Sequence, residues 1–319
     1  MALSRQAQAP RYRESRAAIT MWIAKNRPRA HSGKMTEANR TVGVVGLGII
    51  GSRVAKNLRD KGWHTCVWNR TPQDHPDALG SPGEVASQAS VVQIFVRDGE
   101  ALLEVIDGMA SQLGEGHVIL NHATVSPEAT REAAQRTGSA GAAFMDCPFT
   151  GSRDAAAAGK LNYYVGGEQQ VLEQVRGVLD ASAHTITHLG KIGTATVLKI
   201  ATNMISATTV AILAEALAVC EQGGVELQKL EQALAVNGCA SGLSGMKLPT
   251  MLAGDYDAHF SLKNMLKDAQ FGLARAGDSD TDLPVLASAA AAMLEQMDAG
   301  RGEEDYSVVY EKYRGGQKP

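Results

Sequence analysis

The sequence has few cysteines, and no motif joins them. Cys66, Cys147, Cys220 and Cys239 are scattered over 319 residues and form no C-x-x-C pair. This spacing fits neither a disulfide framework nor a zinc knuckle, so it favours a reducing compartment. We therefore expect a cytoplasmic protein without a metal site. Cys147 could be a nucleophile, but a small buried residue is the favoured interpretation.

Long apolar runs and an excess of basic residues are also missing. A bilayer span needs roughly 18–20 uncharged apolar residues, and the best candidate, residues 197–220, is interrupted by Lys199, Asn203 and Glu215. The net charge of -3 argues against a general nucleic-acid surface, because phosphate binding needs surplus Lys and Arg. We expect a soluble globular protein with neither a membrane nor a nucleic acid as partner.

Acidic residues are scarce in the first 40 residues. This segment holds nine Lys and Arg residues against Glu14 and Glu37. An Arg-rich, acid-poor segment is typical of a mitochondrial transit peptide. The favoured alternative is a mis-assigned start, with translation beginning at Met35. Either way, we expect residues 1–40 to be disordered and outside the fold.

From Thr41 onward, short β-rich runs alternate with helical patterns. Ser81-Pro82-Gly83-Glu84 predicts a capping box, Ser126-Pro127 predicts a second helix start, and Gly138 predicts that helix's end. Alternation with short loops predicts an α/β fold with a Rossmann-type doubly wound parallel sheet over residues 41–190. The expected strands are Thr41–Gly46, His64–Asn69, Val91–Val96, His117–Asn121, Ala143–Cys147, Asn162–Val165 and His184–Leu189.

Strands cease after about Gly190, so residues 191–319 are expected to form an all-helical domain for substrate binding and dimerisation. Residues 191–222 predict one long helix that is apolar on most sides, which must be buried among neighbours or against a second subunit. We expect a homodimer or homotetramer. Further helical patterns cover Leu227–Val236, Ser261–Arg275, Leu283–Met297 and Ser307–Tyr313.

The first strand runs into a G-x-G-x-x-G motif, formed by Gly46, Leu47, Gly48, Ile49, Ile50 and Gly51. The motif alone is weak evidence, but here it follows an apolar strand and opens a helical pattern over Ser52–Lys61. The glycines allow a tight turn and a close backbone approach to a pyrophosphate, and the helix N-terminus supplies N–H groups. The motif predicts a dinucleotide site.

No acid stands where the second strand ends. An NAD site usually has Asp or Glu there to bind the ribose 2′-hydroxyl, whereas this chain has Asn69, Arg70 and Thr71. Arg70 offers a planar fork suited to a 2′-phosphate, and Thr71 adds a hydroxyl. The sequence therefore predicts NADP, with NAD as the less favoured cofactor.

A second constellation lies in "GKIGTATVLKIATNM" from Gly190 to Met204. Lys199 and Asn203 are four residues apart and share a helix face. A buried lysine whose pKa is lowered can pass a proton near neutral pH. A snorkelling lysine at a domain boundary explains the spacing equally well.

Five ordered motifs shift the balance toward a catalytic lysine: "GLGIIG", "NRT", "MDCPFTGS", "GKIGTATVLKIATN" and "FSLKNMLKDAQ". Together they resemble the β-hydroxyacid dehydrogenase family from about Thr41 to the C-terminus. Members include 3-hydroxyisobutyrate dehydrogenase, tartronate semialdehyde reductase and the glyoxylate/succinic semialdehyde reductases. The resemblance implies interconversion of a small carboxylated aldehyde and its hydroxy acid.

The resemblance also implies roles for single residues. Lys199 matches the catalytic lysine, which gives a proton to the substrate oxygen during reduction and takes it back during oxidation. Asn203 matches an asparagine that positions substrate. Thr124 and Lys267 match residues that contact the cofactor. The stretch Thr150, Gly151 and Ser152 stands where the family has Ser-Gly-Gly, which holds the substrate carboxylate.

This chain departs from the family beside that carboxylate anchor. Phe149 replaces valine, Thr150 replaces serine, and Ser152 replaces a glycine that could occupy positive φ. The substrate is therefore expected to differ from the familiar ones. His122 and Arg97 could also face ligands, although a satisfied loop histidine is the favoured interpretation for His122. For Glu215, a solvated or interface charge is favoured.

Three other functions remain open. Imine reductases share the architecture but generally lack the lysine, and 6-phosphogluconate dehydrogenase has a much larger helical domain. A catalytically inactive, NADP-binding interaction protein is the alternative from another class. Lys199 argues against an imine reductase, and retention of both Lys199 and Asn203 favours an enzyme over the inactive interaction protein.

Overall fold

A computed structural model describes residues 40–277 and 281–314. The expectations for residues 1–39 lie outside the described residues. The Arg40 carbonyl accepts a hydrogen bond from the His64 amide at 2.9 Å, and this bond leads directly into the first strand pair. The proposed division at residues 190 and 191 stays a prediction.

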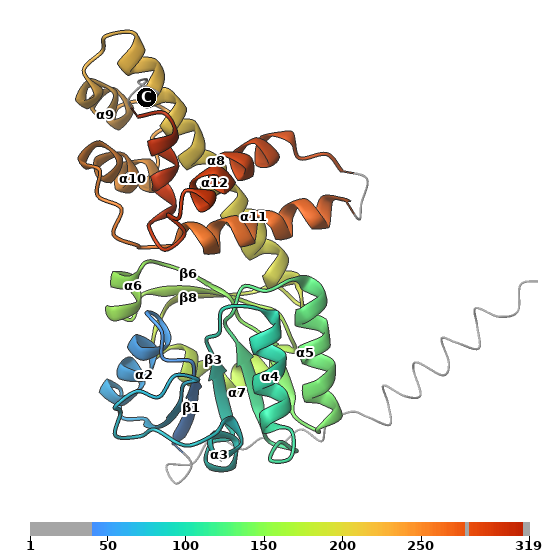
Figure 1. The fold of residues 1–319 in the computed structure, drawn as a ribbon. Helices are drawn as coiled ribbons and strands as arrows, with labels where there is room; N and C mark the ends of the chain where they lie inside the picture. Colours follow the sequence, from blue (N-terminus) through green and yellow to red (C-terminus); the bar gives the residue numbers. More distant parts are fainter. Residues whose placement is uncertain (1–39, 278–280, 315–319) are drawn as a thin grey trace, which may run out of the picture. The chain divides into compact units, whose positions relative to one another are not determined.

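Five parallel strands form the main sheet in the order β2-β1-β3-β4-β5 (Figure 1). The topology is doubly wound, as the alternation of strands and helices predicts. Each predicted strand is present, with ends that differ by one or two residues. The strands are β1 (Thr41–Val45), β2 (His64–Trp68), β3 (Val91–Ile94), β4 (Val118–Asn121) and β5 (Ala143–Asp146).

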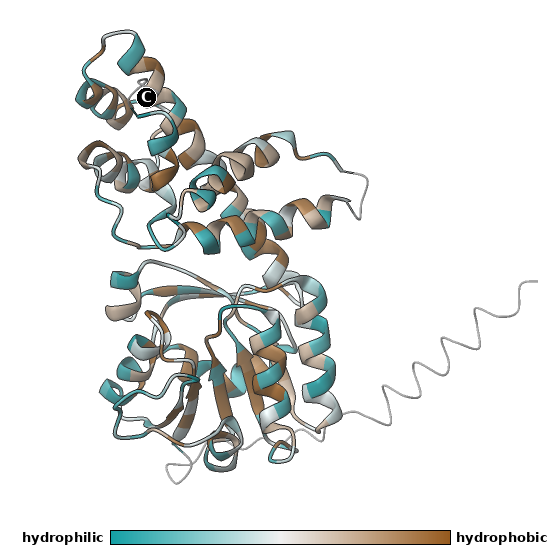
Figure 2. Ribbon diagram, viewed as in Figure 1, coloured by the Kyte–Doolittle hydropathy of each residue, from teal (hydrophilic) through white to brown (hydrophobic). Residues whose placement is uncertain are grey.

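Two separate cores cover the two faces of this sheet. One contains side chains of α2 (Gly51–Asp60) and α7 (Gln169–Leu179). The other contains side chains of α3 (Pro82–Gln88), α4 (Gly99–Met109) and α5 (Pro127–Ser139). The strands β3 and β4 are buried along their whole length, as expected for parallel strands covered on both faces. Figure 2 shows the same division, with apolar strands inside and polar outer helix faces.

The helix starts follow the sequence signals closely. Ser81 and Ser126 each accept a hydrogen bond from an amide in the first turn, and a proline follows each of them. The predicted capping box is only half formed, because the Glu84 carboxylate accepts from the Gly80 amide. Gly138 does not end α5, which runs on to Ser139.

A smaller sheet continues from β5 in the order β6-β7-β8. Its strands are β6 (Phe149–Thr150), β7 (Leu161–Val165) and β8 (Ala183–His188), and α6 (Arg153–Ala157) lies between β6 and β7. The two-residue strand β6 was not expected, because Pro148 and Gly151 enclose it and leave too short a run to detect. It pairs antiparallel with β7.

The remaining elements are helical, as predicted. The helix predicted over Ser307–Tyr313 is a 3₁₀-helix over Tyr306–Lys312 rather than an α-helix. The helix α10 was not expected, because Pro249 lies inside it. The long helix begins at Thr194 rather than at 191, because Gly193 adopts φ +90°. The elements are α8 (Thr194–Gln222), α9 (Leu227–Ala235), α10 (Gly242–Ala253), α11 (Leu262–Gly277), α12 (Pro284–Asp298) and η2 (Tyr306–Lys312).

The α8 helix is only partly covered within the described residues. By length and composition this helix could cross a membrane, and 39% of its most apolar 18-residue stretch is buried within the protein. Ile205, Ile212 and Val219 are 58–70% exposed and recur every seven residues. An apolar row of this kind on a helix that also contributes to a core is typical of an interface.

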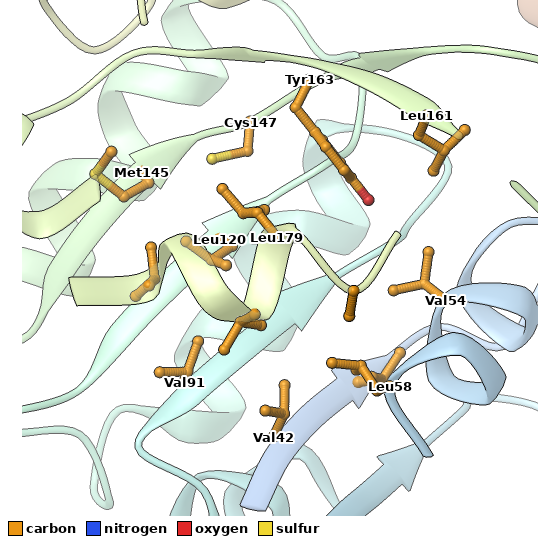
Figure 3. Close-up of a cluster of buried hydrophobic side chains, with 14 of the residues drawn as sticks. Val42, Val54, Leu58, Val91, Leu120, Met145, Cys147, Leu161, Tyr163 and Leu179 are labelled. Atoms are coloured by element: carbon orange, nitrogen blue, oxygen red, sulfur yellow. The ribbon is translucent and has the colours of Figure 1, made fainter. Parts of the chain in front are cut away.

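Cys147 belongs to the core between the sheet and α7, beside Met145 and Tyr163 (Figure 3). Its side chain is fully buried, and burial raises the pKa of its thiol. A thiol that stays protonated is a poor nucleophile. The structure thus agrees with the interpretation of Cys147 as a small core residue.

Candidate active site

The glycine-rich turn after β1 leaves no room for side chains at two of its three glycines. A Cβ on Gly46, which has φ +93°, would lie 2.1 Å from the Phe95 carbonyl oxygen. A Cβ on Gly51 would lie 1.9 Å from the Gly46 carbonyl oxygen. Gly48 faces open space, because no atom of the described residues lies within 4 Å of the place a Cβ would take, so a ligand can approach the backbone there.

The same turn presents hydrogen-bond donors at the N-terminus of α2. Within residues 40–277 and 281–314, the amides of Gly48, Ile49 and Ile50 have no protein acceptor. Three N–H groups at a helix N-terminus suit a phosphate, because the helix dipole adds partial positive charge. The residues present therefore fit a dinucleotide pyrophosphate.

Asn69 holds this turn against the end of β2. Its Oδ1 accepts from the Leu47 amide at 2.9 Å, and its Nδ2 donates to the Thr71 carbonyl at 2.7 Å. An aspartate could accept the first bond but could not donate the second. Arg70 and Thr71 are exposed beside it, so the strand end presents a cation and a hydroxyl.

A buried carboxylate at the end of β5 fixes the start of α8. Asp146 accepts from the amides of Gly193 and Thr196 at 3.1 and 2.9 Å, and from Thr196 Oγ1 at 2.8 Å. This cap satisfies donors that the first helical turn leaves free. It also ties the turn that precedes Lys199 to the carboxyl end of the sheet, where ligands bind in doubly wound folds.

A chain of polar contacts leads from Lys199 to the loop after β4. The Lys199 ammonium donates to Asn203 Oδ1 at 2.9 Å, and Asn203 Nδ2 donates to Asp268 Oδ2 at 2.6 Å. Lys267 Nζ lies 3.1 Å from Asp268 Oδ1 and donates to the Thr124 carbonyl at 2.5 Å. The ammonium and the carboxylate on its two sides fix the orientation of the Asn203 amide.

Lys199 has the electrostatic properties required of a proton donor. Burial lowers its pKa to about 8, the nearby Asp268 carboxylate opposes this shift, and Lys267 adds to it. A group with this pKa exchanges protons readily near neutral pH. The snorkelling alternative does not fit, because Lys199 is buried rather than extended into solvent.

The predicted carboxylate anchor lies on β6 and the turn that follows it. Gly151 has φ +141°, whereas Ser152 has φ −78° and caps α6 by accepting from the Ala155 amide. The concern that Ser152 had lost a glycine's freedom is therefore wrong. The residue that needs this freedom is Gly151, and Ser152 adopts backbone angles open to any residue.

Asp268 is the residue of this site that sequence reasoning missed. It is fully buried and bridges the lysine-asparagine pair to Lys267. The sequence held one indication of it: an acidic residue next to Lys267 within a helical pattern is buried only when it is paired. No spacing rule, however, links residue 268 to residue 203.

Three further residues considered from the sequence are either exposed or bonded within the protein core. Arg97 is exposed and pairs with Asp98 at 2.7 Å. Glu215 is exposed and accepts from the Tyr313 hydroxyl at 3.4 Å, which agrees with a solvated or interface charge. His122 is buried and bonded at both ring nitrogens, which agrees with a satisfied histidine.

Two family models match consecutive parts of the chain. The NAD binding domain of 6-phosphogluconate dehydrogenase matches residues 41–190, and the NAD-binding domain of NADP-dependent 3-hydroxyisobutyrate dehydrogenase matches residues 193–313. Among solved structures, the 3-hydroxyisobutyrate dehydrogenase of Mycobacterium tuberculosis covers 86% of this chain and 99% of its own, with a TM-score of 0.79 and 23% identity. That likeness is one of fold.

Two curated relatives differ in how much of their own length matches this chain. The cytokine-like nuclear factor N-PAC of Mus musculus is 27% identical over 89% of this chain, which spans 53% of the relative. The chain thus spans about half the length of N-PAC relatives. Glyoxylate/succinic semialdehyde reductase 1 of Arabidopsis thaliana is 27% identical over 85% of this chain and 97% of its own length. The matches agree with the fold and the five motifs: the chain belongs to the β-hydroxyacid dehydrogenase family.

Proposed function

We propose that this chain is an NADP-dependent reductase of small carboxylated aldehydes of the semialdehyde or glyoxylate type, and in reverse a dehydrogenase of the hydroxy acids. One observation carries the proposal: the buried Lys199 ammonium, with a pKa of about 8, is bonded to Asn203. A relative that is a reductase, and that matches this chain over 97% of its own length, supports the same reaction class.

In this proposal Lys199 donates its proton to the aldehyde oxygen as the carbonyl carbon is reduced. The nicotinamide, when bound, supplies the hydride to that carbon. The oxygen becomes a hydroxyl, and Lys199 is left neutral until water reprotonates it. In the oxidative direction the neutral amine takes the hydroxyl proton. An ammonium also stabilises negative charge that develops on the oxygen.

The carboxylate of the substrate is assigned to the turn of Thr150, Gly151 and Ser152. A turn with a flexible glycine and hydroxyls can present N–H groups to an anion. The Ser152 hydroxyl already caps α6, so we assign the side-chain contact to Thr150. Asn203 keeps its oxygen on the Lys199 ammonium and so aligns the proton donor.

NADP is assigned over NAD from the end of β2. Arg70 is exposed there, and no carboxylate is present to bind a ribose 2′-hydroxyl or to repel a 2′-phosphate. Asn69 accepts from the Leu47 amide of the glycine turn and donates to the Thr71 carbonyl, so it ties the turn to this strand end. We assign Arg70 and Thr71 to the 2′-phosphate, and Thr124 and Lys267 to the nicotinamide end.

The test is NADPH oxidation with glyoxylate, succinic semialdehyde, methylmalonate semialdehyde and tartronate semialdehyde, each compared with NADH. The Lys199→Ala variant is the matched control. It should lose at least about 100-fold in turnover, the usual contribution of a proton-transfer group, while it binds NADPH like the wild type. A wild type that oxidises no NADPH with any carboxylated aldehyde would contradict the proposal.

A second candidate is a non-catalytic, NADP-binding interaction protein. The similarity to N-PAC, a nuclear factor, favours it. In that case the wild type would bind NADPH tightly, would turn over none of the four aldehydes, and would not respond to Lys199→Ala. An imine reductase would instead oxidise NADPH only with imine substrates.

We also propose that the chain forms a homo-oligomer through α8. The exposed Ile205, Ile212 and Val219 lie at heptad spacing, and antiparallel pairing with the same helix of a second copy would bury this row. A second copy suits the row because a two-fold interface brings identical apolar surfaces together.

A further inference from the structure

His122 lies directly after β4, in the core at the carboxyl end of the sheet. Its ring is 2% exposed. The Nδ1 atom is 2.7 Å from the Cys147 carbonyl oxygen, and Nε2 is 2.9 Å from Gln93 Oε1. Gln93 is also fully buried, on β3. Two buried polar side chains thus meet where three strands end.

The hydrogen bonds define the form of the ring. Burial lowers the pKa of His122 to about 3, so the ring is neutral at physiological pH. The Cys147 carbonyl can only accept, so Nδ1 carries the proton and Nε2 is the acceptor. Gln93 must then turn its NH₂ group toward His122 Nε2. This orientation gives a partner to Gln93 Nε2, which otherwise has none among the residues that the structure describes.

Aromatic rings surround His122. Phe95 stacks on it with centroids 4.4 Å apart and planes 13° apart, and the Tyr163 centroid is 5.2 Å away. Phe95 also adjoins the glycine-rich turn, because its carbonyl oxygen is the atom that a Cβ on Gly46 would meet. The ring centroid of Phe149, on β6, is 6.2 Å from that of Phe95.

The ring is therefore close to three segments of the proposed site. In sequence it is two residues before Thr124. Through Phe95 it supports the cofactor turn. Through the Cys147 carbonyl it holds the chain three residues before Thr150. The Cys147 amide donates to the Asn121 carbonyl at 2.7 Å, so both backbone groups of Cys147 are fixed from the end of β4.

We propose that His122 is a positioning residue, whose Nδ1–H bond to the Cys147 carbonyl sets the place of the β6 carboxylate anchor. This inference rests on the proposed function, since it concerns the anchor of that site. A buried imidazole and amide cost desolvation that an apolar pair would avoid. Their presence at this junction is explained if the bond from His122 to the Cys147 carbonyl fixes the segment that leads to Thr150.

Two variants separate the hydrogen bond from the ring stack. His122→Asn keeps a donor, because Asn Nδ2 stands where His Nδ1 stands, but it removes the ring. His122→Phe keeps a ring against Phe95 but removes the donor. A merely structural role predicts changes in thermal stability for both and the same KM for both.

The measurements are KM and kcat for the best aldehyde, the Kd of NADPH, and the Kd of succinate with the NADPH-loaded protein. His122→Phe should raise KM and the succinate Kd about tenfold, the loss of one buried hydrogen bond. The NADPH Kd should stay within about twofold. His122→Asn should keep KM within about 1.5-fold of the wild type while its melting temperature falls.

Equal KM values for wild type and His122→Phe would overturn the positioning role, as would equal increases in both variants. If His122→Phe does not fold, Gln93→Met replaces it. This change removes the partner of Nε2, frees the ring to change tautomer, and should raise KM about threefold.

The proposed function fails separately from the positioning role. Turnover in the wild type together with identical KM values in the variants refutes the positioning role only. If the wild type turns over no aldehyde but His122→Phe still raises the Kd of succinate, only the reductase assignment is refuted. A wild type that neither turns over an aldehyde nor binds succinate overturns both.

Discussion

The Lys199 ammonium donates a 2.9 Å hydrogen bond to Asn203 Oδ1, one turn further along α8. Asn203 is oriented in turn by the Asp268 carboxylate 2.6 Å away. The proton donor of the proposed reaction is therefore held by an amide whose direction a buried charge decides.

The pH dependence of turnover should follow Lys199. Its pKa is lowered from 10.5 to about 8 by burial. Reduction needs the ammonium, so its rate should fall as pH rises through about 8, while oxidation should rise over the same range. Initial rates in both directions between pH 6 and 10 measure this. A reduction rate that is constant to pH 10 would exclude Lys199 as the donor.

The lysine should also cost stability. A folded pKa below the unfolded value means that unfolding takes up a proton, so stability is lost as pH falls from 10.5 through 8. Lys199→Met should then raise the free energy of unfolding at pH 7 by about 1–3 kcal/mol while it abolishes turnover. Urea unfolding at pH 7 and pH 10 gives the comparison, and the gain should shrink at pH 10.

Asp268 and Lys267 should shift the same pKa in opposite directions. The Asp268 carboxylate raises the pKa of Lys199 and the Lys267 ammonium lowers it. Asp268→Asn should therefore move the alkaline limb of reduction to lower pH, and Lys267→Met should move it to higher pH. Shifts of the same sign in the two pH profiles would show that charge is not the cause.

Arg70 should decide the cofactor. Arg70→Ala should raise the Kd of NADPH about tenfold, the loss of one charge-assisted contact to phosphate, and leave the Kd of NADH nearly unchanged. Quenching of protein fluorescence measures both constants. Arg53, whose guanidinium donates to the Ile49 carbonyl at the pyrophosphate turn, offers the matched control, because Arg53→Ala should weaken both cofactors equally.

The cap of α8 should carry measurable stability. Asp146→Ala removes the acceptor of three buried hydrogen bonds, and should cost about 2–4 kcal/mol in urea unfolding. Thr196→Val keeps both amide bonds to Asp146 but removes the hydroxyl, which is bonded to Asp146 Oδ1 and to Thr130 Oγ1, and should cost about 1–2 kcal/mol. If both variants were equally stable, Asp146 would not act as the cap.

The exposed row on α8 should control assembly. Ile212→Glu places a charge in the middle of the row and should convert an oligomer to monomers in sedimentation experiments, because an unpaired charge is costly to bury. Val236→Glu, on another exposed apolar side chain, is the control and should leave assembly unchanged. A wild type that is monomeric, or that partitions into lipid vesicles, would contradict the proposal.

Periodic patterns predicted the fold well because they depend on neighbours in sequence. The parallel strands appear as short apolar runs, and Ser81 and Ser126 with their prolines mark helix starts. The pattern failed where an element was too short, as at Phe149–Thr150, or contained Pro249. Among the site residues, the four-residue spacing drew attention to Lys199 and Asn203, and the resemblance to the family supplied their roles.

The sequence by itself determined the doubly wound sheet, the glycine-rich turn and the lysine-asparagine pair, since each depends on residues that are only a few positions apart in the chain. Only the tertiary structure decided that Asp268 orients Asn203, that Asp146 fixes the start of α8, and that Gly151 rather than Ser152 needs positive φ. Those facts depend on contacts between residues up to 65 positions apart, and such pairs form only when the packed cores bring their elements together.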